Sequence, residues 1–199
     1  MDIYFINLNL EQSILKDKIL LNKIHHNLSR LFLKHILEKT YNIKSEILEK
    51  NKKPYILNNQ LFFNISHSEN IIGIVFDKYE VGLDIEYKRK RNIIGLLKHY
   101  GLEKEKLTHE EFYQLWTVYE AEYKSGNQNK LISFNYKNYM CSISCKYDIV
   151  DNFFEIMITN PKLYNLDKNI DKTDYNICSL DFSNVKLLKK LGLKIFSKK

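Results

Sequence analysis

The longest periodic segment of the chain, Leu15–Glu38, constrains the fold more than any other feature. Its apolar residues recur every three or four positions, which predicts a helix with one face turned toward a core. This stripe comprises Ile19, Leu20, Ile24, Leu28, Leu31, Phe32, His35 and Ile36. The basic residues between them predict a solvated opposite face.

Shorter segments fill most of the remaining chain. Runs rich in β-branched and aromatic residues predict strands at Ile3–Leu8, Leu61–Ile65, Ile71–Phe76, Val81–Glu86, Leu131–Phe134, Tyr139–Cys145, Phe153–Thr159 and Ile177–Phe182. Further helices are predicted at Ile93–Tyr100, Thr108–Lys124 and Asn184–Lys199. Thr108 and Glu111 have the spacing of a capping box. Strands and helices alternate without a regular βαβ cadence, which indicates an α+β fold.

The charge balance narrows the class of partner. The chain of 199 residues is long enough for one large domain or two small ones, and it carries 31 Lys and Arg against 24 Asp and Glu. This basic excess favours an acidic partner, such as a phosphate-rich cofactor or an acidic protein, or else it reflects a solvated lysine-rich surface.

Cysteine usage and the N-terminus bear on the compartment. Cys141, Cys145 and Cys178 are odd in number and lack a framework spacing, which argues against a disulfide-stapled secreted domain. The first residues do not have the pattern of a signal peptide, and no apolar run approaches the length of a membrane span. We therefore expect a cytoplasmic protein with no membrane partner.

Two acidic segments are the strongest candidates for a catalytic or metal-binding site. On a strand, Asp84 and Glu86 point to the same face, and on a helix Glu120 and Lys124 lie one turn apart. If the two segments meet, three carboxylates and an ammonium surround one point, which is suited to Mg²⁺ and a phosphate. Taken singly, the first pair fits a solvated strand face and the second an ordinary helix ion pair.

A third segment, Phe63–Ser68, ends a strand in a turn rich in hydrogen-bonding groups. His67 alone would more often be structural, and neighbours in sequence rarely form a catalytic Ser/His pair. Neither the P-loop pattern nor the dinucleotide-binding glycine pattern occurs.

The order and spacing of these segments resemble the Sfp-type 4′-phosphopantetheinyl transferases over about residues 52 to 124. Phe63–Ser68 matches that family's F-N-x-S-H-S, and Val81–Glu86 matches its V-G-x-D-x-E, at every fixed position. Lys53-Pro54 matches a Gly-Lys-Pro signature without its glycine. The segment from Trp116 to Lys124 matches W-x-x-K-E-x-x-x-K except at Tyr119, where the family usually has lysine.

The resemblance implies a Mg²⁺-dependent enzyme. It would move 4′-phosphopantetheine from coenzyme A to a serine of an acyl or peptidyl carrier protein, releasing adenosine 3′,5′-bisphosphate. The implied metal ligands are Asp84, Glu86 and Glu120, and the implied catalytic residues are Glu120 and Lys124. The base that takes the serine proton is either Glu120 or a metal-bound water. The implied coenzyme A contacts are Lys23, His25, Lys53, Ser66, His67 and Lys124.

The family fold implied is two similar α+β halves related by a pseudo-twofold, with the active site in the cleft between them. Residues 1–80 would form the N-terminal half, with the coenzyme A nucleotide contacts. Residues 81–199 would form the C-terminal half, with the Mg²⁺-binding strand and helix. Such a chain would be self-sufficient as a monomer and would need no nucleic acid.

Three alternatives stay open. Tyr119 and the altered loop after the helix would suit a degenerate module that binds carrier protein or coenzyme A without turnover. Glu86-Tyr87-Lys88, with Asp77 upstream, would suit a Mg²⁺-dependent nuclease. A nucleic-acid binder using Lys88–Arg91 is a weaker possibility, because the chain has no recognised stacking motif.

Overall fold

The computed structural model describes residues 1–50, 53–57, 61–93, 95, 97, 107–128, 130–158, 175–180 and 186–188. In chain order its helices and strands are β1 (Asp2–Asn7), α1 (Gln12–Lys16), α2 (Lys18–Lys39), β2 (Ile47–Lys50), β3 (Lys53–Ile56), β4 (Phe62–Ser68), β5 (Ile71–Asp77), β6 (Gly82–Tyr87), α4 (His109–Ser125), β7 (Lys130–Tyr136), β8 (Tyr139–Cys145), β9 (Asn152–Ile158), β10 (Tyr175–Leu180) and β11 (Lys186–Leu187).

The strands form two larger sheets and a hairpin. The first sheet has the order β10-β9-β1-β5-β4 and the second has the order β11-β7-β8-β6, while β2 pairs only with β3. All neighbouring strands are antiparallel except β1 and β9, which are parallel. The fold is therefore mixed α+β, as the irregular order of strands and helices predicts.

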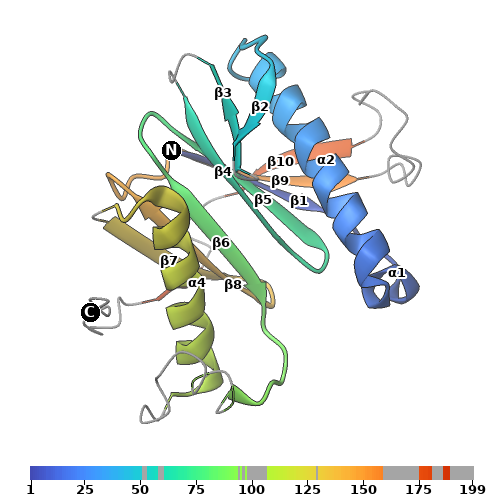
Figure 1. The fold of residues 1–199 in the computed structure, drawn as a ribbon, viewed down its shortest axis with the longest axis vertical. Helices are drawn as coiled ribbons and strands as arrows, with labels where there is room; N and C mark the ends of the chain where they lie inside the picture. Colours follow the sequence, from blue (N-terminus) through green and yellow to red (C-terminus); the bar gives the residue numbers. More distant parts are fainter. Residues whose placement is uncertain are drawn as a thin grey trace.

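Each larger sheet carries one long helix on its outer face (Figure 1). α2 packs on the first sheet through a core that includes Leu28, Phe32 and Phe76. The two sheets face each other across a second core, to which Phe5 and Ile143 belong. α4 covers the other face of the second sheet, where Phe112 and Tyr113 pack against Met140. This layering leaves β4 and β6 as edge strands that lie side by side between the two helices.

A ladder of side chains joins these two edges. Strand alternation turns Asn64, Ser66 and Ser68 of β4 toward β6. Their oxygens accept hydrogen bonds from the backbone N–H groups of Leu83 at 3.0 Å, Ile85 at 3.2 Å and Tyr87 at 3.0 Å. Side-chain oxygens thus take the place of the backbone carbonyls that a continuous sheet would use.

Most predicted elements agree with the structure, and the exceptions have local causes. The helix predicted at Leu15–Glu38 is broken at Asp17, whose carboxylate caps α2 by accepting from Ile19 and Leu20. Ile19 is 85% exposed and Leu20 40% exposed, so the predicted stripe is wrong at its start. These two residues lie in the first turn of α2, at the end that extends beyond the strands of the sheet in Figure 1.

The C-terminal predictions were tested only in part. β10 (Tyr175–Leu180) overlaps the strand predicted at Ile177–Phe182 and begins two residues earlier, whereas residues 186–187 form β11, where a helix was predicted at Asn184–Lys199. Pairing with β7 favours the extended form there. The rest of that predicted helix, and most of the one at Ile93–Tyr100, lie outside the described residues. No helix among the described residues is long and apolar enough to cross a membrane.

Candidate active site

The close approach of α4 to β6 builds the site. At Gly82, a Cβ atom would overlap the main-chain oxygen of Ala121 and lie 2.8 Å from the Ser125 nitrogen. Only glycine therefore lets the last turns of α4 sit directly on β6. Two residues further along the strand, Asp84 faces Lys124 of the same helix.

Buried hydroxyl groups hold α4 in this position. The Thr117 hydroxyl lies 2.7 Å from that of Ser142 on β8, and Ser125 donates to Ser144 at 2.8 Å. All four side chains are buried, so each hydroxyl needs a protein partner. The helix is thereby fixed relative to the second sheet, and with it the place of Glu120 and Lys124.

Lys124 and Asp84 form the centre of the site. The Lys124 ammonium lies 2.7 Å from Asp84 Oδ1 and also donates to the Leu83 carbonyl at 3.1 Å and to Ser66 Oγ at 3.4 Å. The Ser66 hydroxyl donates to the same Asp84 oxygen at 3.1 Å. Three segments that the sequence analysis singled out thus meet at one carboxylate.

Asp84 carries an unused ligand atom. The residue is only 6% exposed, and its Oδ2 is buried without a hydrogen-bond partner among the described residues. Burial raises the pKa of Asp84 above its ordinary value, and the Lys124 ammonium offsets this only in part. A buried carboxylate oxygen with no partner is costly, and a cation would satisfy it.

Glu86 lies two residues further along β6 and is half-buried. Burial, followed by the charge of Asp84, raises its pKa, while Arg91 and Arg89 act in the opposite direction. The Arg91 guanidinium is 3.6 Å from the Glu86 carboxylate. Two neighbouring carboxylates that both resist ionisation are typical of a site that gains from a bound cation.

The position of Glu120 follows from the direction of α4. Near the start of that helix, the Tyr113 hydroxyl accepts from the Arg89 nitrogen at 3.1 Å and donates to the Arg89 carbonyl at 3.0 Å. Near its end, Lys124 contacts Asp84. The helix therefore runs antiparallel to β6, and Glu120 falls between these two contacts, along the stretch of β6 that carries Glu86. Tyr119, which precedes it, is exposed.

Within the residues that the structure describes, no three His, Cys, Asp or Glu side chains gather closely enough to hold a metal ion. Lys124 neutralises Asp84 instead. The Mg²⁺ site formed by Asp84, Glu86 and Glu120 therefore stays a prediction. The free Oδ2 of Asp84 and the all-oxygen donor set fit that ion.

His67 points away from this centre. Because strand alternation turns Ser66 toward β6, the next side chain faces α2, where the His67 ring stacks on that of His25 with centroids 4.3 Å apart. Although His67 is exposed at the surface, desolvation of its ring by the surrounding protein lowers its pKa to about 4, and His25 and Lys124 act in the same direction. His25 is buried, and Lys23 lies exposed on the same helix. The structure thus brings His25 and His67 together and leaves Lys23 at the surface.

Lys53 links the β2–β3 hairpin to the end of α4. Its ammonium donates to the main-chain oxygen of Lys124 at 2.9 Å and lies 3.7 Å from the carboxylate of Glu80. A cation at a helix C-terminus satisfies a free carbonyl and the negative end of the helix dipole.

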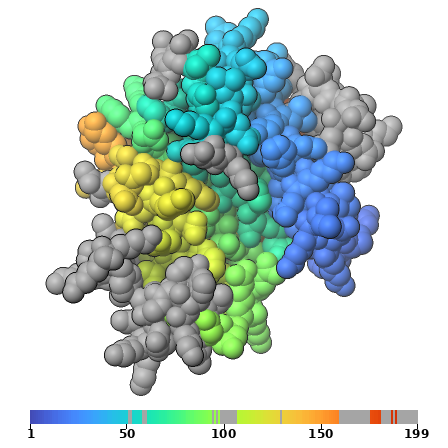
Figure 2. All heavy atoms as spheres, viewed as in Figure 1, coloured from blue at the N-terminus to red at the C-terminus, as the bar shows by residue number. Residues whose placement is uncertain are grey.

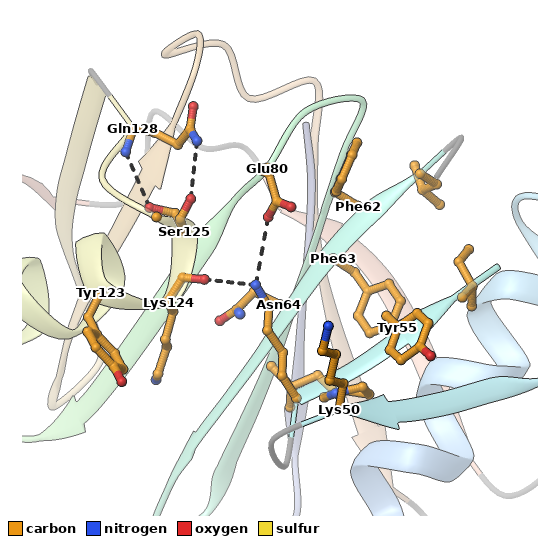
Figure 3. Close-up of a pocket in the computed structure, with 16 residues that line it drawn as sticks. Lys50, Tyr55, Phe62, Phe63, Asn64, Glu80, Tyr123, Lys124, Ser125 and Gln128 are labelled. Atoms are coloured by element: carbon orange, nitrogen blue, oxygen red, sulfur yellow. Dashed lines mark hydrogen bonds and ion pairs between the residues drawn. The ribbon is translucent and has the colours of Figure 1, made fainter. Parts of the chain in front are cut away.

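A cavity of about 1020 Å³ opens between the hairpin, β4 and α4. In Figure 3, Tyr123 and Lys124 stand on one side of it, and Lys50, Tyr55 and Phe63 stand on the other. Figure 2 shows the same face of the molecule, where the atoms of β4 lie between those of α2 and α4. The volume of this cavity is that of an ordinary small-molecule site.

Three residues of the site, Asn64, Ser68 and Arg91, were not among those predicted from the sequence. Asn64 and Ser68 complete the ladder to β6, and their period-two spacing with Ser66 was the available signal. Arg91 contacts Glu86 and lies over the Tyr113 ring at 5.7 Å. The basic run Lys88–Arg91 was considered only as a nucleic-acid contact. In the structure, Lys88 and Arg89 are also paired with carboxylates, those of Glu110 and Glu69.

The geometry does not favour the nuclease arrangement. Asp77 lies opposite Phe62, at the end of β4 far from Ser66, whereas Glu86 follows the residue that Ser66 contacts. Four strand residues separate the two levels, which corresponds to about 13 Å. Asp77 and Glu86 are therefore too far apart to share one metal ion directly.

No family model matches the chain. A curated protein of Haemophilus influenzae named "Putative 4'-phosphopantetheinyl transferase" is 34% identical over 85 residues, an alignment that covers 37% of this chain and 36% of that protein. The chain therefore spans about a third of this relative's length. The partial similarity supports a transferase of this general kind and does not identify its type.

Proposed function

We propose that the protein transfers 4′-phosphopantetheine from coenzyme A to a serine hydroxyl of an acyl or peptidyl carrier protein, in a Mg²⁺-dependent reaction. One observation carries the proposal: the ammonium of Lys124 lies 2.7 Å from Asp84 and 3.4 Å from Ser66, which joins three distant motifs in one site. The similarity to the Haemophilus influenzae protein supports the same reaction class.

In this reaction the serine oxygen forms a new bond to the phosphorus next to the pantetheine arm. The bond from that phosphorus to the oxygen of the adenosine phosphate breaks, and adenosine 3′,5′-bisphosphate leaves. Glu120 is our candidate for the base that accepts the serine proton. Lys124 is our candidate for the cation that stabilises charge on the departing phosphate, for which it must exchange some of its contact with Asp84.

Asp84, Glu86 and Glu120 would hold the Mg²⁺ ion. When bound, the ion supplies neutralisation of the pyrophosphate oxygens. The protein's own part is to keep the buried Asp84 and the half-buried Glu86 beside each other. Their raised pKa values mean that both carboxylates gain from a nearby positive charge.

The coenzyme A nucleotide would bind along the cavity of about 1020 Å³. Lys53 lines this cavity, and His67 lies further along β4. An exposed basic residue such as Lys23 would attract the phosphates without a fixed geometry. We regard the two-half architecture, divided at residue 80, as part of the same proposal. β9 and β10 lie in the first sheet, so the two halves would be interleaved.

The test is transfer of a label from the pantetheine arm of coenzyme A to acyl and peptidyl carrier proteins, with Mg²⁺ or with a chelator. We expect label on the carrier protein only with Mg²⁺. Tight coenzyme A binding without transfer to any carrier protein from the same source would favour the degenerate binding module. Mg²⁺-dependent cleavage of DNA, run in parallel, would favour the nuclease.

A further inference from the structure

The stacked pair of histidines contains one ring that a ligand can reach and one that it cannot. His67 is exposed on β4, whereas His25 on α2 is only 1% exposed. Their ring centroids are 4.3 Å apart and their planes differ by 27°. Because so little of the His25 side chain is exposed, it has little surface with which to contact coenzyme A directly.

The His25 ring is held in one orientation. Its Nε2 lies 2.7 Å from the main-chain oxygen of Glu69, and because a carbonyl can only accept, Nε2 carries the proton. Its Nδ1 is then a bare acceptor, buried without a partner among the described residues. Burial lowers the pKa of His25, so the ring is neutral at physiological pH.

His67, in contrast, is exposed, and the His25 ring covers one of its faces. The strand beneath it is fixed, since Ser66 and Ser68 on either side are bonded to β6. The flat face of His25 and a hydrogen bond to the backbone of His67 itself both restrict the torsions of the exposed imidazole.

We propose that His25 is a positioning residue that holds the His67 imidazole in the orientation in which it meets an anionic ligand, and that His25 makes no contact of its own with that ligand. The inference rests on the proposed function, in which the anion is a phosphate of coenzyme A. In this proposal His25 does not contact coenzyme A directly, and it affects binding through His67.

The test is a double-mutant cycle, with the affinity for coenzyme A and for adenosine 3′,5′-bisphosphate measured by calorimetry. We expect His25→Ala to weaken binding about three- to tenfold, the usual worth of an aromatic stack. The His25→Ala/His67→Ala double variant should bind like His67→Ala alone, because the effect passes through His67. His25→Phe, which keeps a flat ring, should recover most of the loss. His26→Ala, an exposed imidazole next in the chain, is the matched control.

Losses that add in the double variant would overturn the inference, because they would mean that His25 contacts the ligand itself. Unchanged binding by His25→Ala would overturn it as well. If the unsubstituted protein binds neither compound, the proposed function fails at this site. A second measurement keeps the two failures apart.

The second measurement is the His67 titration, followed by NMR in the ligand-free protein. His25→Ala should raise the pKa of His67 from about 4 toward its ordinary value, and His25→Phe should keep it low. His26 of α2 and Lys124 of α4 also lower the pKa of His67, a hydrogen bond to its own backbone raises it, and all three are retained in these variants. An unchanged His67 pKa in His25→Ala would show that the stack does not exist in solution.

Discussion

The Ser66 hydroxyl bridges the two sheets at the centre of the site, and Ser66→Ala tests this directly. In the variant, the buried N–H of Ile85 loses its acceptor and Asp84 loses a hydrogen-bond donor. An orphaned buried N–H costs about 1–3 kcal/mol, and a hydrogen bond to a charged group contributes about 1.5–3 kcal/mol. Lys124 remains on Asp84 and limits the second loss. We therefore expect a decrease of about 2–4 kcal/mol in the free energy of unfolding.

The assay is urea denaturation with a parallel thermal melt. For a chain of this size, the expected loss corresponds to a decrease in Tm of about 5–15 °C. Ser13→Ala is the matched control, because Ser13 is an exposed serine of α1 outside the ladder, and this variant should stay within about 0.5 kcal/mol of the unsubstituted protein. If Ser66→Ala is as stable as Ser13→Ala, the side-chain ladder does not join the sheets as described.

Three further predictions concern the elements that build the site. Gly82→Ala should cost about 2–4 kcal/mol in urea denaturation, because the new methyl group overlaps the backbone of α4 at Ala121; a cost below 0.5 kcal/mol would contradict that close approach. Thr108→Ala should cost about 1 kcal/mol by the same method, since Thr108 caps α4, and an unchanged midpoint would argue against the capping box. Finally, burial raises the pKa of Asp84 and of Glu86, so both are more protonated at pH 5 than at pH 7.5 and a cation must then displace protons. The rise in Tm on adding Mg²⁺ should therefore be larger at pH 7.5, and equal rises at both pH values would count against the metal site.

Local signals accounted for the elements that the sequence predicts well. The capping box at Thr108 marks the start of α4, and the alternating strands around Asp84 form β6 as expected. Where burial or strand pairing depends on residues distant in sequence, the local apolar pattern does not predict it. Ile19 and Leu20 continue the apolar stripe, yet both are exposed, because the first turn of α2 extends beyond the described strands of the sheet (Figure 1). β2 was missed because it is a short strand that, among the described residues, pairs with β3 alone.

The site residues also divide into those that local sequence motifs predict and those that depend on contacts distant in sequence. Asp84 and Lys124 could be proposed as neighbours from motif spacing, and the structure brings their charged groups to 2.7 Å. Arg91 could not be connected with Glu86, since that contact depends on how the chain turns after β6. The orientation of His67 toward α2 was implicit in the alternation with Ser66, but its stacking on His25 depends on the packing of a helix distant in sequence.

The intact mass of a purified acyl or peptidyl carrier protein, after incubation with this protein, coenzyme A and Mg²⁺, tests the central claim most directly. We expect the carrier to gain the mass of one phosphopantetheine group and an equal amount of adenosine 3′,5′-bisphosphate to be released. The Asp84→Asn variant, checked for folding by its thermal melt, should leave the carrier unchanged. A carrier that stays unmodified with the unsubstituted protein, or one that Asp84→Asn modifies at the full rate under limiting Mg²⁺, would contradict the account.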